Sequence, residues 1–179
     1  MRKLPIAGAL LASLCAVSAY AQQPATMPDR SAKMPLTATS FATQAATIGQ
    51  AEIELGRLAQ KNSEDVNVKR YGERMVKDHT AAAAKLSKAA EAQNLRLPKE
   101  LDMQHKAVID KLSKMKGKEF DAAYSAEMAK GHDKAVALFE SAAQDAAMPS
   151  DLKQFATATL PTLEEHRELA HNLHGKEGA

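Results

Sequence analysis

The chain has 179 residues, of which 45% are hydrophobic and only 4% aromatic, and it carries a formal net charge of +2 at pH 7. Alanine-rich sequence without tryptophan favours closely packed helices over a β-sheet, and the length suits one domain. No basic block or interleaving of aromatic and basic residues is present, which argues against nucleic acid as a partner.

Residues 1–21 are organised as a secretory signal peptide. Arg2 and Lys3 precede a mostly apolar run, and Ala19-Tyr20-Ala21 provides an A-x-A cleavage site. The run is shorter than the roughly 20 apolar residues that a transmembrane helix needs, and no later segment reaches that length. We therefore expect a periplasmic or secreted protein with no transmembrane segment after cleavage. Cleavage also removes Cys15, the one cysteine, so the mature chain forms no disulfide.

After the leader, residues 22–37 contain three prolines among small and polar residues and are predicted to form a flexible linker. Residues 38–175 are predicted to form one helical domain, because apolar residues recur every three or four positions. The pattern predicts long helices at 39–61, 65–93, 118–147 and 151–173, and a shorter helix at 99–115. Two short turns and one long crossover connect them. We therefore expect an all-α, ferritin-like four-helix bundle with a short extra helix in the crossover.

Local signals set the predicted ends of these helices. Thr39 and Ser150 are suitable N-cap residues. Gly117 is predicted to end the short helix. Pro161 is predicted to kink the last helix, because it removes one backbone hydrogen bond.

A nine-residue pattern occurs twice. Tyr71 to His79 reads YGERMVKDH and Tyr124 to His132 reads YSAEMAKGH, so Tyr, Met, Lys and His recur at the same offsets. An internal repeat suggests two helices with related roles. Each histidine lies within a stripe of small and apolar residues at helical spacing, so we expect both imidazoles to be buried. The two tyrosines are expected to close the core, with their hydroxyls at its edge.

Each long helix contributes one ionisable residue to its apolar stripe. In chain order they are Glu52, His79, His132 and His166. His132 and His166 lie equally far from Pro149 in the turn between them, and His79 lies almost as far from the first turn. Glu52 lies five residues closer to that first turn than His79 does, roughly 7 Å along a helix axis. The three histidines are therefore expected to share a layer, to which Glu52 would have to reach.

Two interpretations of these residues stay open. A buried polar group without a partner costs about 1–3 kcal/mol, so each must be satisfied. In the first interpretation the imidazoles form hydrogen bonds with Glu52, Thr162, tyrosine hydroxyls, carbonyls or water. In the second, His79, His132, His166 and Glu52 bind a divalent transition metal. Asp78 and Glu165 would then orient the ligands.

No catalytic constellation stands out. No Ser-His-Asp, Cys-His, paired-acid or glycine-rich phosphate motif is present, and the one Glu-x-x-His, Glu168 to His171, lies near the C-terminus. A carboxylate-bridged di-iron site needs that motif on two helices. We therefore favour a non-enzymatic structural, interaction or envelope-stress module with a protein or envelope partner, over a metal-binding bundle. A third hypothesis is a pH response through the buried histidines.

Several segments match one family in order along the chain: residues 51–59 (AEIELGRLA), 75–79 (MVKDH), 117–124 (GKEFDAAY), His132 and 160–166 (LPTLEEH). They resemble exported bacterial proteins with a ferritin-like domain of unknown function, often labelled as outer membrane proteins. The resemblance implies a ferritin-like helical bundle outside the cytoplasm and no established reaction. Association with the outer membrane stays open. Gly131 departs from the family pattern, in which acidic residues often precede the second histidine.

Overall fold

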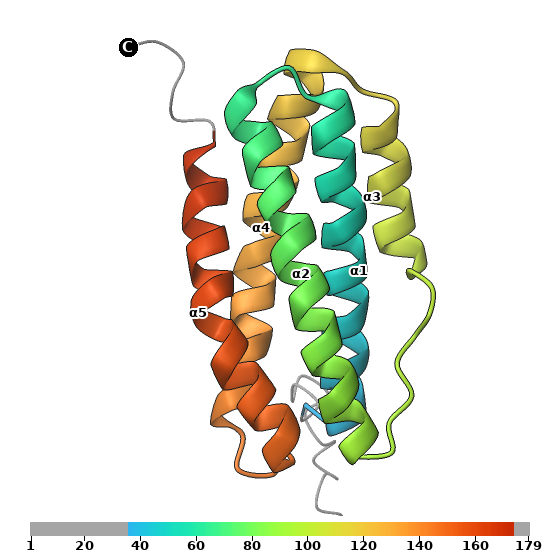
Figure 1. Ribbon diagram of the computed structural model, residues 1–179, viewed down its shortest axis with the longest axis vertical. Coiled ribbons are helices and arrows are strands. Elements are labelled where there is room, and N and C mark those ends of the chain that lie inside the picture. Colours follow the sequence, from blue (N-terminus) through green and yellow to red (C-terminus); the bar gives the residue numbers. More distant parts are fainter. Residues whose placement is uncertain (1–35, 174–179) are drawn as a thin grey trace, which may run out of the picture. The chain divides into compact units, whose positions relative to one another are not determined.

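A computed structural model describes residues 36–173 of the chain. The predicted signal peptide and all but the last two residues of the predicted linker lie outside these residues. The described part contains five helices and no strand, which confirms the all-α prediction (Figure 1). They are α1 (Ala38–Asn62), α2 (Val66–Ala92), α3 (Met103–Ser113), α4 (Gly117–Gln144) and α5 (Ser150–Asn172). None of these five has the length and apolar character to cross a membrane.

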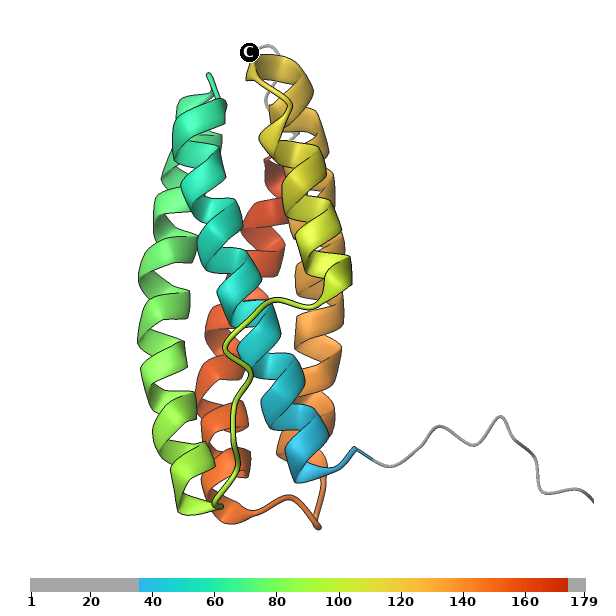
Figure 2. The same cartoon turned by 90° about the vertical axis from the view of Figure 1, so that its right-hand side faces the viewer.

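The order of the helices determines which of them run in the same direction. Short turns make antiparallel pairs of α1 with α2 and of α4 with α5, as Figure 1 shows. The segment that contains α3 returns the chain along the helices before α4 begins (Figure 2). Consequently α2 and α4 run in the same direction. Helix α1 packs against α2 and α4, and α5 packs against the same two helices.

The cap of α1 differs from the prediction. The N-cap is Thr37, whose Oγ1 accepts a hydrogen bond from the backbone N–H of Ser40 at 3.1 Å. Thr39 instead lies in the first turn of the helix. Both threonines suit an N-cap chemically, and the one chosen is the one whose backbone is extended.

Two other predicted boundaries also change. Ser150 is the first residue of α5, and the preceding Pro149 is its cap residue without a side-chain capping bond. Gly117 begins α4 instead of ending α3, which ends four residues earlier at Ser113. The positive φ of Gly117, 52°, suits glycine and turns the chain between the two helices. Helix α5 continues through Pro161 as a single element.

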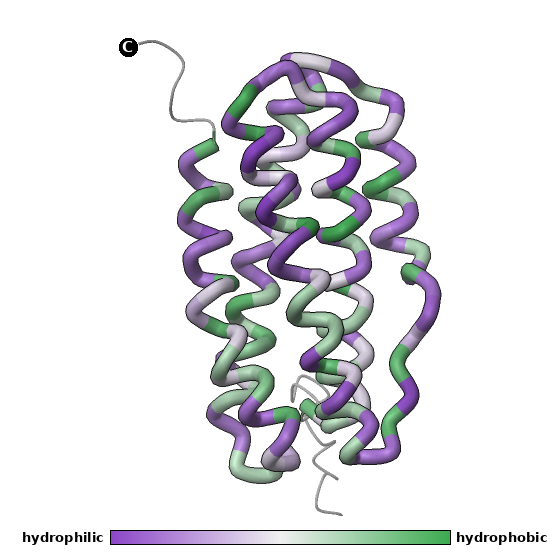
Figure 3. Tube along the Cα trace, viewed as in Figure 1, coloured by the Kyte–Doolittle hydropathy of each residue, from purple (hydrophilic) through white to green (hydrophobic). Residues whose placement is uncertain are grey.

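The core has two apolar clusters along the helices. One contains the aromatic rings of Phe41, Phe139 and Phe155, with centroids 5.2 to 6.3 Å apart. The other contains Met75 and Met128 together with two tyrosines and a phenylalanine. Hydrophobic and hydrophilic stretches alternate along every helix, as amphipathic packing requires (Figure 3). The residues between the two clusters are polar, and they form the candidate site.

Helices α1 and α2 approach each other closely at two glycines. A Cβ atom on Gly56 would lie 2.5 Å from the carbonyl oxygen of Gly72, and one on Gly72 would lie 2.6 Å from Cβ of Ala59. Real Cβ atoms are not found at such distances from a backbone atom. The absence of side chains therefore sets the separation of the two helices, close to the turn of α2 that carries His79.

Candidate metal centre

Three buried histidines meet between the two apolar clusters. His79 comes from α2, His132 from α4 and His166 from α5, and one ring nitrogen from each lies within 4.8 Å of the others. Their ring centroids are 5.5 to 5.9 Å apart. The side chains are at most 5% exposed. The structure thus brings together the three histidines that the helical stripes single out.

The hydrogen-bond partners of two histidines determine their tautomers. Nδ1 of His132 lies 3.0 Å from the carbonyl oxygen of Met128. Because a carbonyl only accepts, Nδ1 carries the proton and Nε2 is left with a lone pair. Nε2 of His166 lies 2.9 Å from a carboxylate oxygen of Asp78 and donates to it, which leaves Nδ1 unprotonated.

Each histidine also has a buried ring nitrogen that is not hydrogen-bonded. These atoms are Nε2 of His79, Nε2 of His132 and Nδ1 of His166, and none has a hydrogen-bond partner within residues 36–173. For His132 and His166 they are the lone-pair nitrogens deduced from the partners. A neutral imidazole nitrogen with a lone pair is the usual form of a histidine metal ligand.

The electrostatic environment keeps the three imidazoles neutral. Burial, together with the neighbouring His132 and His166, lowers the pKa of His79 to about 3. Burial lowers the pKa of His132 to about 4, and lowers that of His166 to about 4 against the opposing hydrogen bond to Asp78. A group of three positive charges at this spacing would be strongly disfavoured in a low-dielectric interior. At neutral pH all three rings are therefore available as ligands.

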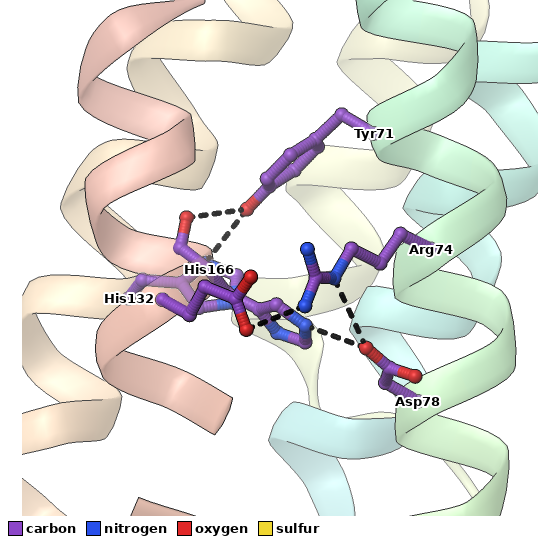
Figure 4. A network of polar contacts seen from close by, with 6 residues as sticks. Tyr71, Arg74, Asp78, His132 and His166 are labelled. Atoms are coloured by element: carbon purple, nitrogen blue, oxygen red, sulfur yellow. Dashed lines mark hydrogen bonds and ion pairs between the residues drawn. The ribbon is translucent and has the colours of Figure 1, made fainter. Parts of the chain in front are cut away.

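A chain of charged groups supports His166 from the surface side (Figure 4). Asp78 accepts a hydrogen bond from His166 and a second from Nε of Arg74 at 3.3 Å, and Nη2 of Arg74 lies 2.6 Å from Glu165. Burial alone would raise the pKa of Asp78, but the contacts with His166 and Arg74 lower it overall. Asp78 thus stays ionised and orients His166 directly. Glu165 acts one step further out, through Arg74.

Tyr71 takes part in the site, as the first interpretation of the sequence allowed for a tyrosine hydroxyl. Its side chain is buried, and its hydroxyl donates to the carbonyl oxygen of His166 at 3.3 Å and lies 3.4 Å from Nδ1 of His132 (Figure 4). Tyr124 is also fully buried, so the prediction of two hydroxyls at the edge of the core is wrong. The helices enclose the rings on every side, which the stripe of a single helix does not reveal.

The two sequence repeats lie in register across the interior. The ring centroids of Tyr71 and Tyr124 are 6.2 Å apart, and those of His79 and His132 are 5.9 Å apart. In each copy the tyrosine precedes the histidine by eight residues, about two helical turns, so both side chains lie on one face. The shared spacing of eight residues was the signal in the sequence that could have placed Tyr71 beside the histidines. Because α2 and α4 run in the same direction, equivalent residues of the two repeats lie side by side.

Glu52 is buried on α1 but does not join the three histidines. The group of mutually close ligand atoms found within residues 36–173 contains His79, His132 and His166 without it. Its Oε1 instead faces α4, where a Cβ atom on Gly131 would lie 3.5 Å from it. Burial raises the pKa of Glu52 to about 8, so the carboxyl group is mostly protonated at neutral pH. Gly131 directly precedes His132, so the carboxyl group reaches to within one residue of the histidine layer without joining the three histidines.

Comparisons with known proteins add a family and a fold. The model of the family described as Domain of unknown function (DUF4142) matches residues 22–173. A solved structure from Streptomyces coelicolor, described as "putative secreted protein DUF305", superposes with a TM-score of 0.64. The two chains are 17% identical over 80% of this chain and 98% of the other, so the likeness concerns the fold alone. No curated protein matches the chain.

Proposed function

This chain belongs to the family of domains of unknown function DUF4142, and we propose that it is an exported helical protein that binds one divalent transition metal ion. His79, His132 and His166 are its ligands. The observation that carries the proposal is the convergence of three buried, neutral imidazoles from three helices, each with a ring nitrogen that lacks a partner in the described part of the chain. Neither the family description nor the structural relative names a metal, so the support comes from this geometry.

A metal ion resolves an energetic problem that hydrogen bonds leave unsolved. A buried ring nitrogen left without any partner costs about 1–3 kcal/mol, and the two lone-pair nitrogens, Nε2 of His132 and Nδ1 of His166, cannot satisfy each other. A divalent cation satisfies all three at once. Imidazole suits zinc, copper, nickel and iron. Three protein ligands also leave an open coordination position, as in catalytic zinc sites.

The residues around the ligands favour the same function. Metal-bound histidines usually donate their second ring nitrogen to a carboxylate or a carbonyl, which fixes the ring orientation. His166 does so to Asp78 and His132 to Met128. Glu52 lies outside the proposed ligand set, because it is protonated and positioned toward Gly131.

We further propose that residues 1–21 are a signal peptide, that residues 22–37 are a linker and that residues 38–175 form a ferritin-like bundle. The leader composition and the secreted relative support export. Two antiparallel helix pairs joined by a long connection support the ferritin-like description.

A structural, non-enzymatic role in the envelope is the second candidate. It is supported by the hydrogen bonds that already satisfy one nitrogen each of His132 and His166, and by the contacts of Tyr71 with both residues. In this case the remaining nitrogens would be hydrated, and the histidines would specify how the helices pack.

Metal titration of tag-free mature protein distinguishes the two candidates. After chelator treatment, we expect one equivalent of zinc or cobalt to bind, and His132→Ala to weaken binding by at least about 100-fold. The matched control is His105→Ala, because His105 is partly exposed on α3 and Asp102 is the only side chain of the described residues to which it hydrogen-bonds. Circular dichroism verifies that both variants fold. Substoichiometric metal that does not depend on His132 would favour the structural role.

A further inference from the structure

A small apolar cavity lies next to the histidines on the side of the phenylalanine cluster. Its volume is about 30 Å³, and all four long helices contribute to its lining. His79 and Thr159 are the only polar side chains among the lining residues, which otherwise are aliphatic and aromatic and include Leu86, Phe139, Phe155 and Leu163. One residue, His79, thus belongs to both the cavity and the proposed metal site.

Gly49 leaves space for this cavity on α1. The residue is buried, yet a Cβ atom built on it would meet no atom within 4 Å. This contrasts with Gly56, about two turns further along the same helix, where a Cβ atom would collide with α2. The absent side chain of Gly49 therefore serves no close helix contact and keeps an interior volume open.

The position of the cavity follows from the order of residues on three helices. Leu86 and Phe139 follow His79 and His132 on α2 and α4, whereas Leu163 precedes His166 on the antiparallel α5. All three therefore lie on the same side of the histidine layer. The opposite side is filled by Tyr71, Met75 and Met128. The cavity therefore lies on one side of the histidine layer and meets it at His79.

The size and polarity of the cavity restrict its occupant. A volume of about 30 Å³ corresponds to roughly one water molecule, but a buried water typically makes about three hydrogen bonds. The lining offers two polar side chains, and one of them is a proposed metal ligand. A neutral molecule of two heavy atoms needs no hydrogen bonds and fits the same volume.

We propose that this cavity holds a neutral diatomic molecule, of the class of nitric oxide and dioxygen, beside the metal bound by His79, His132 and His166. The inference rests on the proposed function for the metal and on the cavity for the ligand. It concerns binding and includes no chemical step.

The first experiment measures nitric oxide binding to protein loaded with Fe²⁺ under anaerobic conditions, by electron paramagnetic resonance and absorption. We expect saturable binding to the wild-type protein and at least tenfold weaker binding to Gly49→Val, which fills the cavity beside His79, with iron stoichiometry measured for both proteins. The matched control is Gly131→Ala, because Gly131 adjoins His132 but does not line the cavity. Equal nitric oxide affinity in Gly49→Val and wild type, with iron bound to both, would overturn the inference and leave the metal proposal intact.

A second measurement does not depend on metal. In metal-free protein, dissolved dioxygen should enhance the nuclear relaxation of the Leu86 and Leu163 methyl protons, and Gly49→Val should abolish the enhancement. Failure to bind any of zinc, cobalt and iron would refute the proposed function, while this measurement would still decide whether the cavity accepts a diatomic molecule. Equal enhancement in both proteins would refute the cavity assignment.

Discussion

Asp78 accepts a hydrogen bond from Nε2 of His166 at 2.9 Å, across 88 positions of sequence. The contact joins α2 to α5 and fixes the tautomer in which Nδ1 of His166 is unprotonated. Arg74 holds the same carboxylate from the outside through its Nε atom. The hydrogen bond between Asp78 and His166 therefore links the orientation of a buried imidazole to a partly exposed carboxylate.

Replacement of Asp78 tests this link. We expect Asp78→Ala to weaken metal binding by about 10–100-fold, because the loss of the carboxylate frees both the ring orientation and the tautomer of His166. Competition against a chromophoric chelator measures the affinity. The matched control is Asp133→Ala, which removes an exposed carboxylate that contacts His171. If both variants bind metal equally well, Asp78 does not orient a ligand.

The stability of the metal-free protein should depend on pH on both sides of a maximum near pH 6.5. Burial lowers the pKa of His79 to about 3 and those of His132 and His166 to about 4, so the unfolded state takes up protons first as the pH falls. Stability is therefore lost on acidification below about pH 6.5. Glu52 acts in the opposite sense, because its raised pKa of about 8 means that the folded state binds the extra proton.

The dependence of the free energy of unfolding on pH can be measured by urea unfolding at a series of pH values. Between about pH 6 and 5, three histidine protons oppose one glutamate proton, and the free energy of unfolding should fall by about 3 kcal/mol per pH unit. From about pH 7 to 8 it should fall by about 1 kcal/mol per unit as the pH rises, because Glu52 remains largely protonated in the folded state and is ionised in the unfolded state. Stability that does not change between about pH 7.5 and 5.5 would remove the histidine-based pH response.

The Glu52→Gln substitution tests whether Glu52 affects stability alone or also takes part in metal binding. The amide keeps the shape of the protonated carboxyl group and cannot ionise, so the decline in stability above about pH 7 should disappear. Metal stoichiometry and affinity should stay at the wild-type values, because the carboxylate lies outside the histidine group. Calorimetric titration at pH 7 measures both quantities. A marked loss of affinity would show that Glu52 is a ligand, as the sequence pattern suggested.

Three glycine-to-alanine substitutions should differ in sign. Gly56→Ala and Gly72→Ala place a Cβ atom 2.5 to 2.6 Å from atoms of the facing helix, so the helices must separate. We expect each to destabilise the protein by about 1–3 kcal/mol. Gly49→Ala meets no atom within 4 Å and should stabilise α1 by about 0.5–1 kcal/mol. Urea unfolding at one pH compares all three, and a destabilised Gly49→Ala would contradict the open space assigned to that position.

The elements and the height of the histidines could be predicted because both depend on local regularities. Amphipathic spacing determines where a helix forms, and a constant rise per residue converts distance from a turn into height. The same counting predicted that Glu52 lies roughly 7 Å nearer the first turn than His79, whereas its carboxyl group faces Gly131, the residue next to His132. One error concerned the cap residue Thr39, where two nearby threonines have the same chemistry and the backbone decides between them. Another concerned the depth of the two tyrosine hydroxyls, which depends on the neighbouring helices.

By itself the sequence determined five helical segments and an inward-facing histidine on three of them. Only the tertiary structure decided which groups those histidines meet: Asp78 with His166, Tyr71 with His132 and His166, and Gly131 in front of Glu52. These pairs depend on how each helix is rotated and how closely it approaches its neighbours. Helical periodicity leaves that rotation uncertain by a side-chain position or more. Contacts between helices, such as the collision that a Cβ atom on Gly56 or Gly72 would cause, remove the uncertainty.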